Sequence, residues 1–116
     1  MKLNIYNIGG KVVKDDDRYL VKDNPVGNKL ILSSTLLEPN KSTSGHFHDG
    51  QEEVYFFMKG SGEMELDSER FKVKEGDIVN IKDEFFIEFS IQIRKSNYIL
   101  YVFLMAEIQQ EKITKQ

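Results

Sequence analysis

An alternation of apolar and polar residues with a period of two is the feature that most constrains the fold of this chain. The alternation is clearest from Phe85 to Ile93, where every second residue is apolar: Phe85, Ile87, Phe89, Ile91 and Ile93. After Phe86, the residues between them are polar: Glu88, Ser90, Gln92 and Arg94. Successive side chains of a β-strand point to opposite faces, so this pattern predicts a strand with one buried face.

Three further segments have the composition of strands. Leu30–Leu37 is a candidate strand, and Val54–Met58 and Tyr98–Ala106 are apolar on both faces. Strands of that last kind need cover on both sides. Another sheet, an N-terminal arm or a second subunit could cover the outer face, and a homodimer is the explanation that we prefer. Turn-forming clusters, among them Asp23–Asn28, recur at the intervals of an all-β sandwich or barrel. We expect no helix before Glu107.

The length and charge of the chain exclude several classes of protein. The chain has 116 residues, enough for one domain, and 16 basic against 19 acidic residues give a net charge of −3. This balance argues against nucleic acid as a partner, and the lack of cysteine excludes disulfides and thiolate chemistry. The N-terminus does not resemble a signal peptide, and the longest apolar run, Tyr98–Ala106, is too short to cross a bilayer. We expect a cytoplasmic protein without a membrane partner.

The two histidines of the chain, His46 and His48, are separated by one residue. In a strand they would lie on the same face and could bind one metal ion together, with a carboxylate as third ligand. Glu52 and Glu53 both follow, and Asp49-Gly50 is a turn or bulge signal that can change the face. Glu53 is the preferred ligand and Glu52 the second choice. A surface hairpin with two exposed histidines is the alternative.

This segment resembles the first conserved motif of the cupins. That motif has the form glycine, five residues, His-X-His, three or four residues, glutamate, six residues, glycine. In this chain, His46-Phe47-His48, Glu53 and Gly60 fit the motif. Asn40 stands at the position of the leading glycine. In the second motif Gly76 fits, whereas four positions differ: Lys82, Glu84, Ile87 and Ile91 replace proline, glycine, histidine and asparagine. The resemblance covers about residues 30–105.

The resemblance implies an all-β fold, an antiparallel double-sheet jelly-roll barrel of the RmlC-like type. We expect one cupin domain over residues 1–116, with a barrel core at about 30–105, an N-terminal strand arm at 1–29 and a polar C-terminal tail at 107–116. The expected pocket-lining residues are the following: Tyr55, Phe57, Ile87 and Tyr101.

By the same resemblance, His46, His48 and Glu53 would hold a divalent metal, such as Fe, Mn, Zn or Ni. Ile87 stands where cupins usually supply a fourth ligand, a histidine, and the chain has no third histidine. Two outcomes therefore remain open. The site binds a metal through three ligands with water at the open positions, or it is degenerate and the pocket binds its ligand without metal.

Three functions are compatible with such a barrel, and the first is the leading hypothesis. The segment around His46 and His48 has a local similarity to cupin-type sugar-phosphate isomerases, in which a metal polarises the sugar and a carboxylate, here Glu53 or Glu52, moves the proton. The second is a non-enzymatic barrel that binds a small molecule such as a carbohydrate. The third is a non-haem iron dioxygenase.

Overall fold

A computed structural model of the chain describes residues 1–27, 29–43, 46–47, 52–66, 68–82, 86–88 and 98–106, with the backbone alone at 46–47, 86–88 and 106. Within these residues the chain forms ten strands: β1 (Lys11–Asp15), β2 (Tyr19–Pro25), β3 (Leu30–Leu37), β4 (His46–Phe47), β5 (Glu53–Lys59), β6 (Ser61–Leu66), β7 (Glu69–Lys74), β8 (Ile78–Ile81), β9 (Phe86–Glu88) and β10 (Ile99–Ala106).

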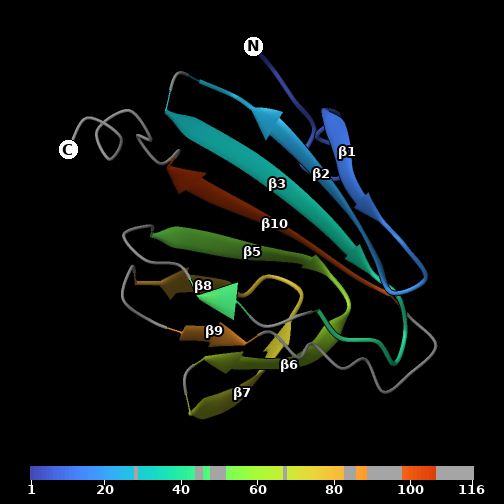
Figure 1. Ribbon diagram of the computed structural model, residues 1–116, viewed down its shortest axis with the longest axis vertical. Helices are drawn as coiled ribbons and strands as arrows, with labels where there is room; N and C mark the ends of the chain where they lie inside the picture. Colours follow the sequence, from blue (N-terminus) through green and yellow to red (C-terminus); the bar gives the residue numbers. More distant parts are fainter. Residues whose placement is uncertain are drawn as a thin grey trace.

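The strands form two antiparallel sheets (Figure 1). A six-stranded sheet has the order β1-β2-β3-β10-β5-β8, and a four-stranded sheet has the order β4-β9-β6-β7. β10, late in the sequence, lies in the middle of the larger sheet between β3 and β5. The predicted all-β, double-sheet jelly-roll architecture is therefore confirmed. Among the described residues no helix is long and apolar enough to cross a membrane.

The expected strands appear with small changes at their ends. Leu30–Leu37 is β3 at the predicted bounds, and the apolar segments near residues 54–58 and 98–106 are β5 and β10. The predicted turn at Asp23–Asn28 was placed too early, because β2 continues to Pro25. In this strand Asp23 pairs with Ser33 and Pro25 pairs with Ile31, so the turn of the β2–β3 hairpin begins only after Pro25. Of the strand predicted at 85–93, only residues 86–88 are described, and the tail at 107–116 lies outside the described residues.

The N-terminal arm joins the larger sheet through β1 and β2. Between them, Asp16 closes a tight turn: its side chain accepts hydrogen bonds from the backbone N–H groups of Arg18 at 2.8 Å and Tyr19 at 3.1 Å. The acidic stretch at residues 15–17 thus runs from the end of β1 into a turn in which Asp16 caps the β1–β2 connection.

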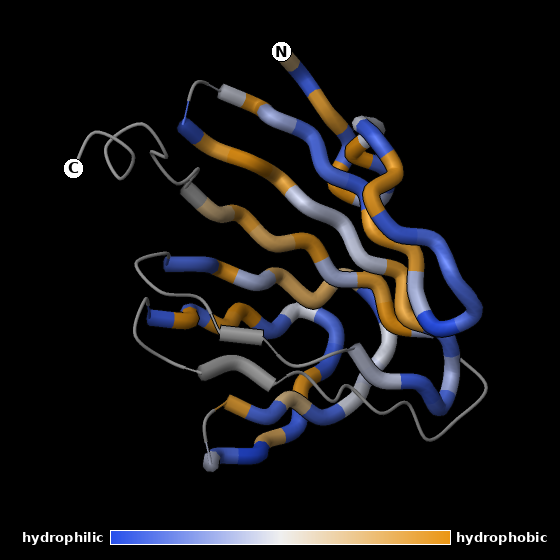
Figure 2. Tube along the Cα trace, viewed as in Figure 1, coloured by the Kyte–Doolittle hydropathy of each residue, from blue (hydrophilic) through white to orange (hydrophobic). Residues whose placement is uncertain are grey.

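The core lies on the inner face of the larger sheet and against the smaller one. Every second residue of β5 is buried, at Glu53, Tyr55 and Phe57, whereas the residues between them are half-buried. The buried apolar cluster takes residues from both sheets: Tyr19, Leu37, Tyr55, Phe57, Met64, Leu66, Val73, Ile81, Ile99 and Tyr101. Figure 2 shows the hydrophobic residues concentrated along β3, β10 and β5. This burial provides most of the stabilisation of the barrel.

Candidate metal and ligand site

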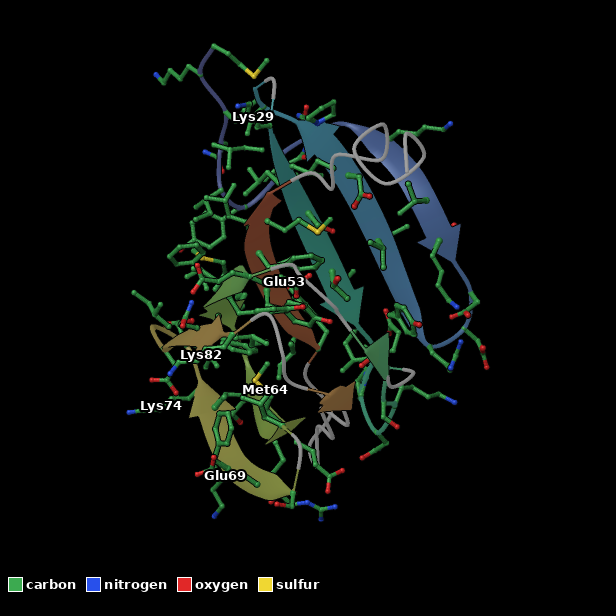
Figure 3. All side chains as sticks on the ribbon, turned by 60° about the vertical axis from the view of Figure 1, so that its left-hand side comes forward. Lys29, Glu53, Met64, Glu69, Lys74 and Lys82 are labelled. Carbon is green, nitrogen blue, oxygen red and sulfur yellow. The ribbon has the colours of Figure 1, made fainter. Side chains whose placement is uncertain are left out.

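Within the part of the chain that the structure describes, Glu53 is the charged residue that is buried. β5 lies between β10 and β8, and Glu53 pairs with Met105 on one side and Ile81 on the other. Its side chain is 0% exposed. Figure 3 shows it near the centre of the molecule, whereas Lys74 extends outward. A buried carboxylate loses its hydration, and proteins compensate for that loss with hydrogen bonds, a counter-charge or a metal ion.

Tyr55, two residues further along β5, supplies one of these compensations. Its hydroxyl donates a hydrogen bond to Glu53 Oε1 at 2.7 Å. The Tyr55 ring is itself buried and stacks on Phe103 of β10, with ring centroids 4.7 Å apart. Burial, together with the nearby Glu53 carboxylate, raises the pKa of Tyr55 well above its ordinary value, so the hydroxyl keeps its proton and remains a donor.

Two other expected pocket residues, Phe57 and Tyr101, lie further along the same inner face, where they pair with each other across β5 and β10. Both are buried, and their ring centroids are 5.6 Å apart. Tyr101 forms a hydrogen bond with Thr35, its pairing partner on β3, and burial raises the pKa of its hydroxyl. Phe57 and Tyr101 therefore form a packed aromatic pair next to Tyr55 on the inner face.

Glu52, the second-choice carboxylate, lies on the opposite side of β5. It is exposed, and the Asn80 side chain donates a hydrogen bond to its Oε2 at 3.4 Å. Asn80 is exposed as well and also donates to the Glu53 backbone carbonyl. Of the two adjacent glutamates, the geometry thus favours Glu53 for a role inside the barrel.

Of the two histidines of the expected site, His46 is the first residue of β4. His46 pairs with Ile87 of β9 in the smaller sheet, so the residue that replaces the usual fourth cupin ligand is its neighbour in register. The expected ligand His48 lies outside the described residues. Among the residues that are described, no three histidine, aspartate or glutamate side chains form a metal-binding group. The donor chemistry of Glu53 fits a divalent cation, since a buried carboxylate of fixed orientation is a ligand that such cations prefer.

The structure adds inner-face residues that the sequence analysis missed. Phe103 pairs with Ser33 on one side and Tyr55 on the other, and it is half-buried. The buried Ser33 hydroxyl donates to Asp23 Oδ1 at 2.8 Å. A signal was present in β3, where Ser33 and Thr35 interrupt an otherwise apolar face at a spacing of two. Polar residues on the inner face of a barrel strand favour contact with a ligand.

Two turns around the site explain the glycine positions of the motif. Asn40, at the leading glycine position, has a φ of 61°, a left-handed conformation that asparagine adopts more readily than most residues. Gly60 has a φ of 86°, and a Cβ there would lie 2.4 Å from the Tyr98 carbonyl oxygen. These turns lie on either side of the segment from His46 to Glu53 in the sequence.

The fold and this motif are similar to those of the cupin superfamily. A family model for the cupin domain matches residues 34–83, which include both histidines and Glu53. An uncharacterized protein of Methanocaldococcus jannaschii is 38% identical over 55 residues. That match covers 47% of this chain and 44% of the relative, so it spans less than half of either protein.

Several solved structures share the fold. KdgF from a Halomonas species superposes with a TM-score of 0.71 at 13% identity, over 88% of this chain and 92% of that protein. A predicted oxalate decarboxylase from Thermotoga maritima gives a TM-score of 0.74 at 15% identity, over 93% and 100% of the two chains. A candidate sugar phosphate isomerase from Acidithiobacillus ferrooxidans gives 0.61 at 16% identity, over 77% and 60%.

Proposed function

We propose that this cupin-like protein binds a small molecule inside its barrel at a divalent-metal site formed by His46, His48 and Glu53. The observation that carries the proposal is the fully buried Glu53 carboxylate on the inner face, held by the Tyr55 hydroxyl at 2.7 Å. The two histidines and this glutamate also have the spacing of the cupin metal motif. A metal bound there would act as a Lewis acid that polarises an oxygen of the ligand.

The roles of the side chains follow from their places in the barrel. Glu53 would bind the metal and would place its negative charge at the centre of the inner face. The buried rings of Phe57 and Tyr101 exclude water from the neighbouring part of the inner face, which strengthens electrostatic interactions in the site. Glu52, exposed on the other side of β5, is a poor candidate for a base in the barrel.

A sugar or sugar phosphate is the ligand class that we propose for the barrel. The half-buried Phe103 offers a ring face on which the C–H groups of a sugar can stack, and the half-buried Asp23 offers a carboxylate as acceptor for its hydroxyls. The candidate sugar phosphate isomerase among the structures of the same fold is consistent with this class. Isomerisation of such a ligand would be the activity to assay first.

Metal content is the first test. Protein purified without chelators and then incubated with Fe²⁺, Mn²⁺, Zn²⁺ or Ni²⁺ should hold about one metal ion per chain after dialysis, as expected for one three-ligand site. The double variant His46→Ala/His48→Ala should hold none. If the wild-type protein also holds none after this treatment, the metal site is refuted and the metal-free alternative replaces it.

Ligand binding is the second test, with a panel of aldohexoses, hexuronates and hexose phosphates followed by saturation-transfer NMR. We expect transfer to at least one of these sugars, and its loss in Phe103→Ala. Phe71→Ala is the matched control, because Phe71 is another half-buried aromatic residue packed against the same core, but it lies on β7 of the other sheet. Equal loss in both variants, or no transfer in the wild type, would refute the sugar proposal.

We also propose that two copies of the chain associate through the outer face of the six-stranded sheet. Half-buried apolar residues continue across three neighbouring strands of this face, where Leu32 and Val54 both pair with Leu104. On β8, at the edge, Ile78 is 66% exposed and pairs with Phe56. A continuous apolar sheet face suits a two-fold interface, in which the same patch is used by both copies.

A further inference from the structure

We propose that Tyr55 is a positioning residue for the metal: its hydroxyl fixes the Glu53 carboxylate in the orientation that binds the cation. The inference deepens the proposed function and rests on it. It concerns a residue that would not touch the metal itself, and that the sequence analysis treated only as part of the pocket wall.

The geometry shows that Tyr55 is able to fix Glu53. Its ring is held from one side by Phe103, at 4.7 Å and an angle of 19° between ring planes, and from another by Tyr101, at 5.6 Å. Its side chain is 1% exposed, so the ring has little room to change rotamer. The hydroxyl of a ring held in this way is a fixed donor, and its bond to Glu53 Oε1 is 2.7 Å long.

The location of the pair on one strand adds to this rigidity. Glu53 and Tyr55 are two residues apart on β5, so both lie on the inner face, and β5 is paired on both sides. A glutamate has three rotatable side-chain bonds and must give up that freedom to bind a metal. When Tyr55 holds one oxygen, this entropy is lost during folding and not during metal binding. Residues that orient metal ligands in this way typically change the affinity by about 10- to 100-fold.

The chain contains a matched control for this role. Tyr101 is as deeply buried as Tyr55, belongs to the same aromatic cluster and also has a hydrogen-bonded hydroxyl. Its partner, however, is Thr35 on β3 and not the proposed metal ligand. Tyr55→Phe and Tyr101→Phe therefore each remove one buried hydroxyl from the same core, but only Tyr55→Phe removes the bond to Glu53.

The experiment is a calorimetric titration of the metal-free protein with Zn²⁺ and Co²⁺, with the unfolding free energy of each metal-free variant measured in parallel. Tyr55→Phe should weaken metal binding by about 10- to 100-fold. Tyr101→Phe should leave the affinity within about twofold of wild type. Both variants should lower the unfolding free energy of the metal-free protein by a similar amount, because each loses one buried hydrogen bond. The visible spectrum of bound Co²⁺ should change in Tyr55→Phe alone.

The outcomes separate the inference from the function beneath it. If the wild-type protein binds neither metal, the proposed function and this inference both fail. If the wild type binds metal and the two variants lose affinity equally, or neither does, the metal site stands and the positioning role of Tyr55 is refuted. If Tyr55→Phe does not fold, carbon-13-labelled tyrosine in the wild type decides. Zn²⁺ should then shift the Tyr55 ring signals more than those of Tyr101, and equal shifts would overturn the inference.

Discussion

Asp16 shows how one exposed carboxylate organises the start of the larger sheet. Its Oδ1 accepts both the Arg18 and the Tyr19 backbone N–H, and the Arg18 guanidinium lies 3.1 Å from Oδ2. The bonds from the Arg18 and Tyr19 backbones, in that order, lower the pKa of Asp16 from 3.8 to about 2. Since the charged form is preferred in the folded state, the carboxylate stabilises the protein above its unfolded pKa, and that contribution is lost as the pH falls through about 2.

Asp16→Asn should make the stability less dependent on pH in this window. The amide keeps an oxygen for the two backbone donors but does not titrate, so the loss of stability between pH 3.8 and about 2 should be smaller than in wild type. Urea unfolding at a series of pH values measures the effect. Asp17→Asn is the control for the loss of one acidic side chain from this turn, because the Asp17 side chain is 84% exposed and the two backbone bonds are accepted by Asp16. Identical slopes for Asp16→Asn and wild type would contradict the interpretation.

The turns at the ends of β5 and β7 determine how the two sheets meet. After β5, Gly60 passes so close to Tyr98 that no side chain fits. After β7, the Gly76 N–H donates to the Phe57 carbonyl at 2.8 Å, and the Phe57 N–H donates to the Asp77 carbonyl at 3.0 Å. Both turns therefore anchor β5, the strand that carries Glu53 and Tyr55, in its place.

Gly60→Ala and Gly76→Ala should separate two costs in unfolding free energy: the strain of a left-handed backbone, and the steric overlap of a new Cβ with its neighbours. Both glycines have left-handed φ values, 86° and 94°, but nothing lies within 4 Å of a Cβ at Gly76. We expect Gly76→Ala to cost about 1 kcal/mol of unfolding free energy. Gly60→Ala should cost about 2 to 4 kcal/mol, because overlap with the Tyr98 backbone adds to the strain. Denaturant unfolding measures both, with Gly27→Ala as a near-neutral reference, and equal costs at positions 60 and 76 would contradict the structure.

For individual strands, the sequence predicted the position well where apolar and polar residues follow a clear pattern. The bounds of β3 and the positions of β5 and β10 could be predicted from local composition. The end of β2 could not, because the pairing of Asp23 with Ser33 depends on a hydrogen bond across two strands. The preference for Glu53 over Glu52 rested on the face that Glu53 shares with Tyr55. The bond between Glu53 and Tyr55 required the three-dimensional structure, since spacing alone does not say where a hydroxyl points.

At the scale of the whole molecule, the outer face of the larger sheet is the surface through which we propose that two copies of the chain associate. The sequence predicted such a face, because Val54–Met58 and Tyr98–Ala106 are apolar on both sides. In the folded chain, Val54 and Phe56 on that face are only half-buried. The sequence could not indicate that Ile78 lies at the edge of the same face, since that follows from the pairing of β8 with β5.

A lysine at this face should dissociate the proposed dimer. Ile78→Lys would bury a charge in an apolar interface, which we expect to raise the dimer dissociation constant by about 30-fold or more. Ser61→Lys is the matched control, because it adds the same charge at an exposed position on the smaller sheet. Light scattering after size exclusion, over a dilution series, measures both. A wild-type protein that is monomeric at every concentration would refute the dimer.

The central place of β10 has a consequence for how the chain is made. β3 and β5 do not pair with each other. β10 lies between them, where Ile99 is the register partner of Leu37 and Tyr101 is the register partner of Phe57. During synthesis, β3 and β5 therefore each keep one edge with unpaired backbone N–H and C=O groups until β10 has left the ribosome. Such edges are templates for aggregation. Nascent chains that stall before β10 should depend on chaperones far more than complete ones, and a premature stop in this strand should yield insoluble protein and not a smaller barrel.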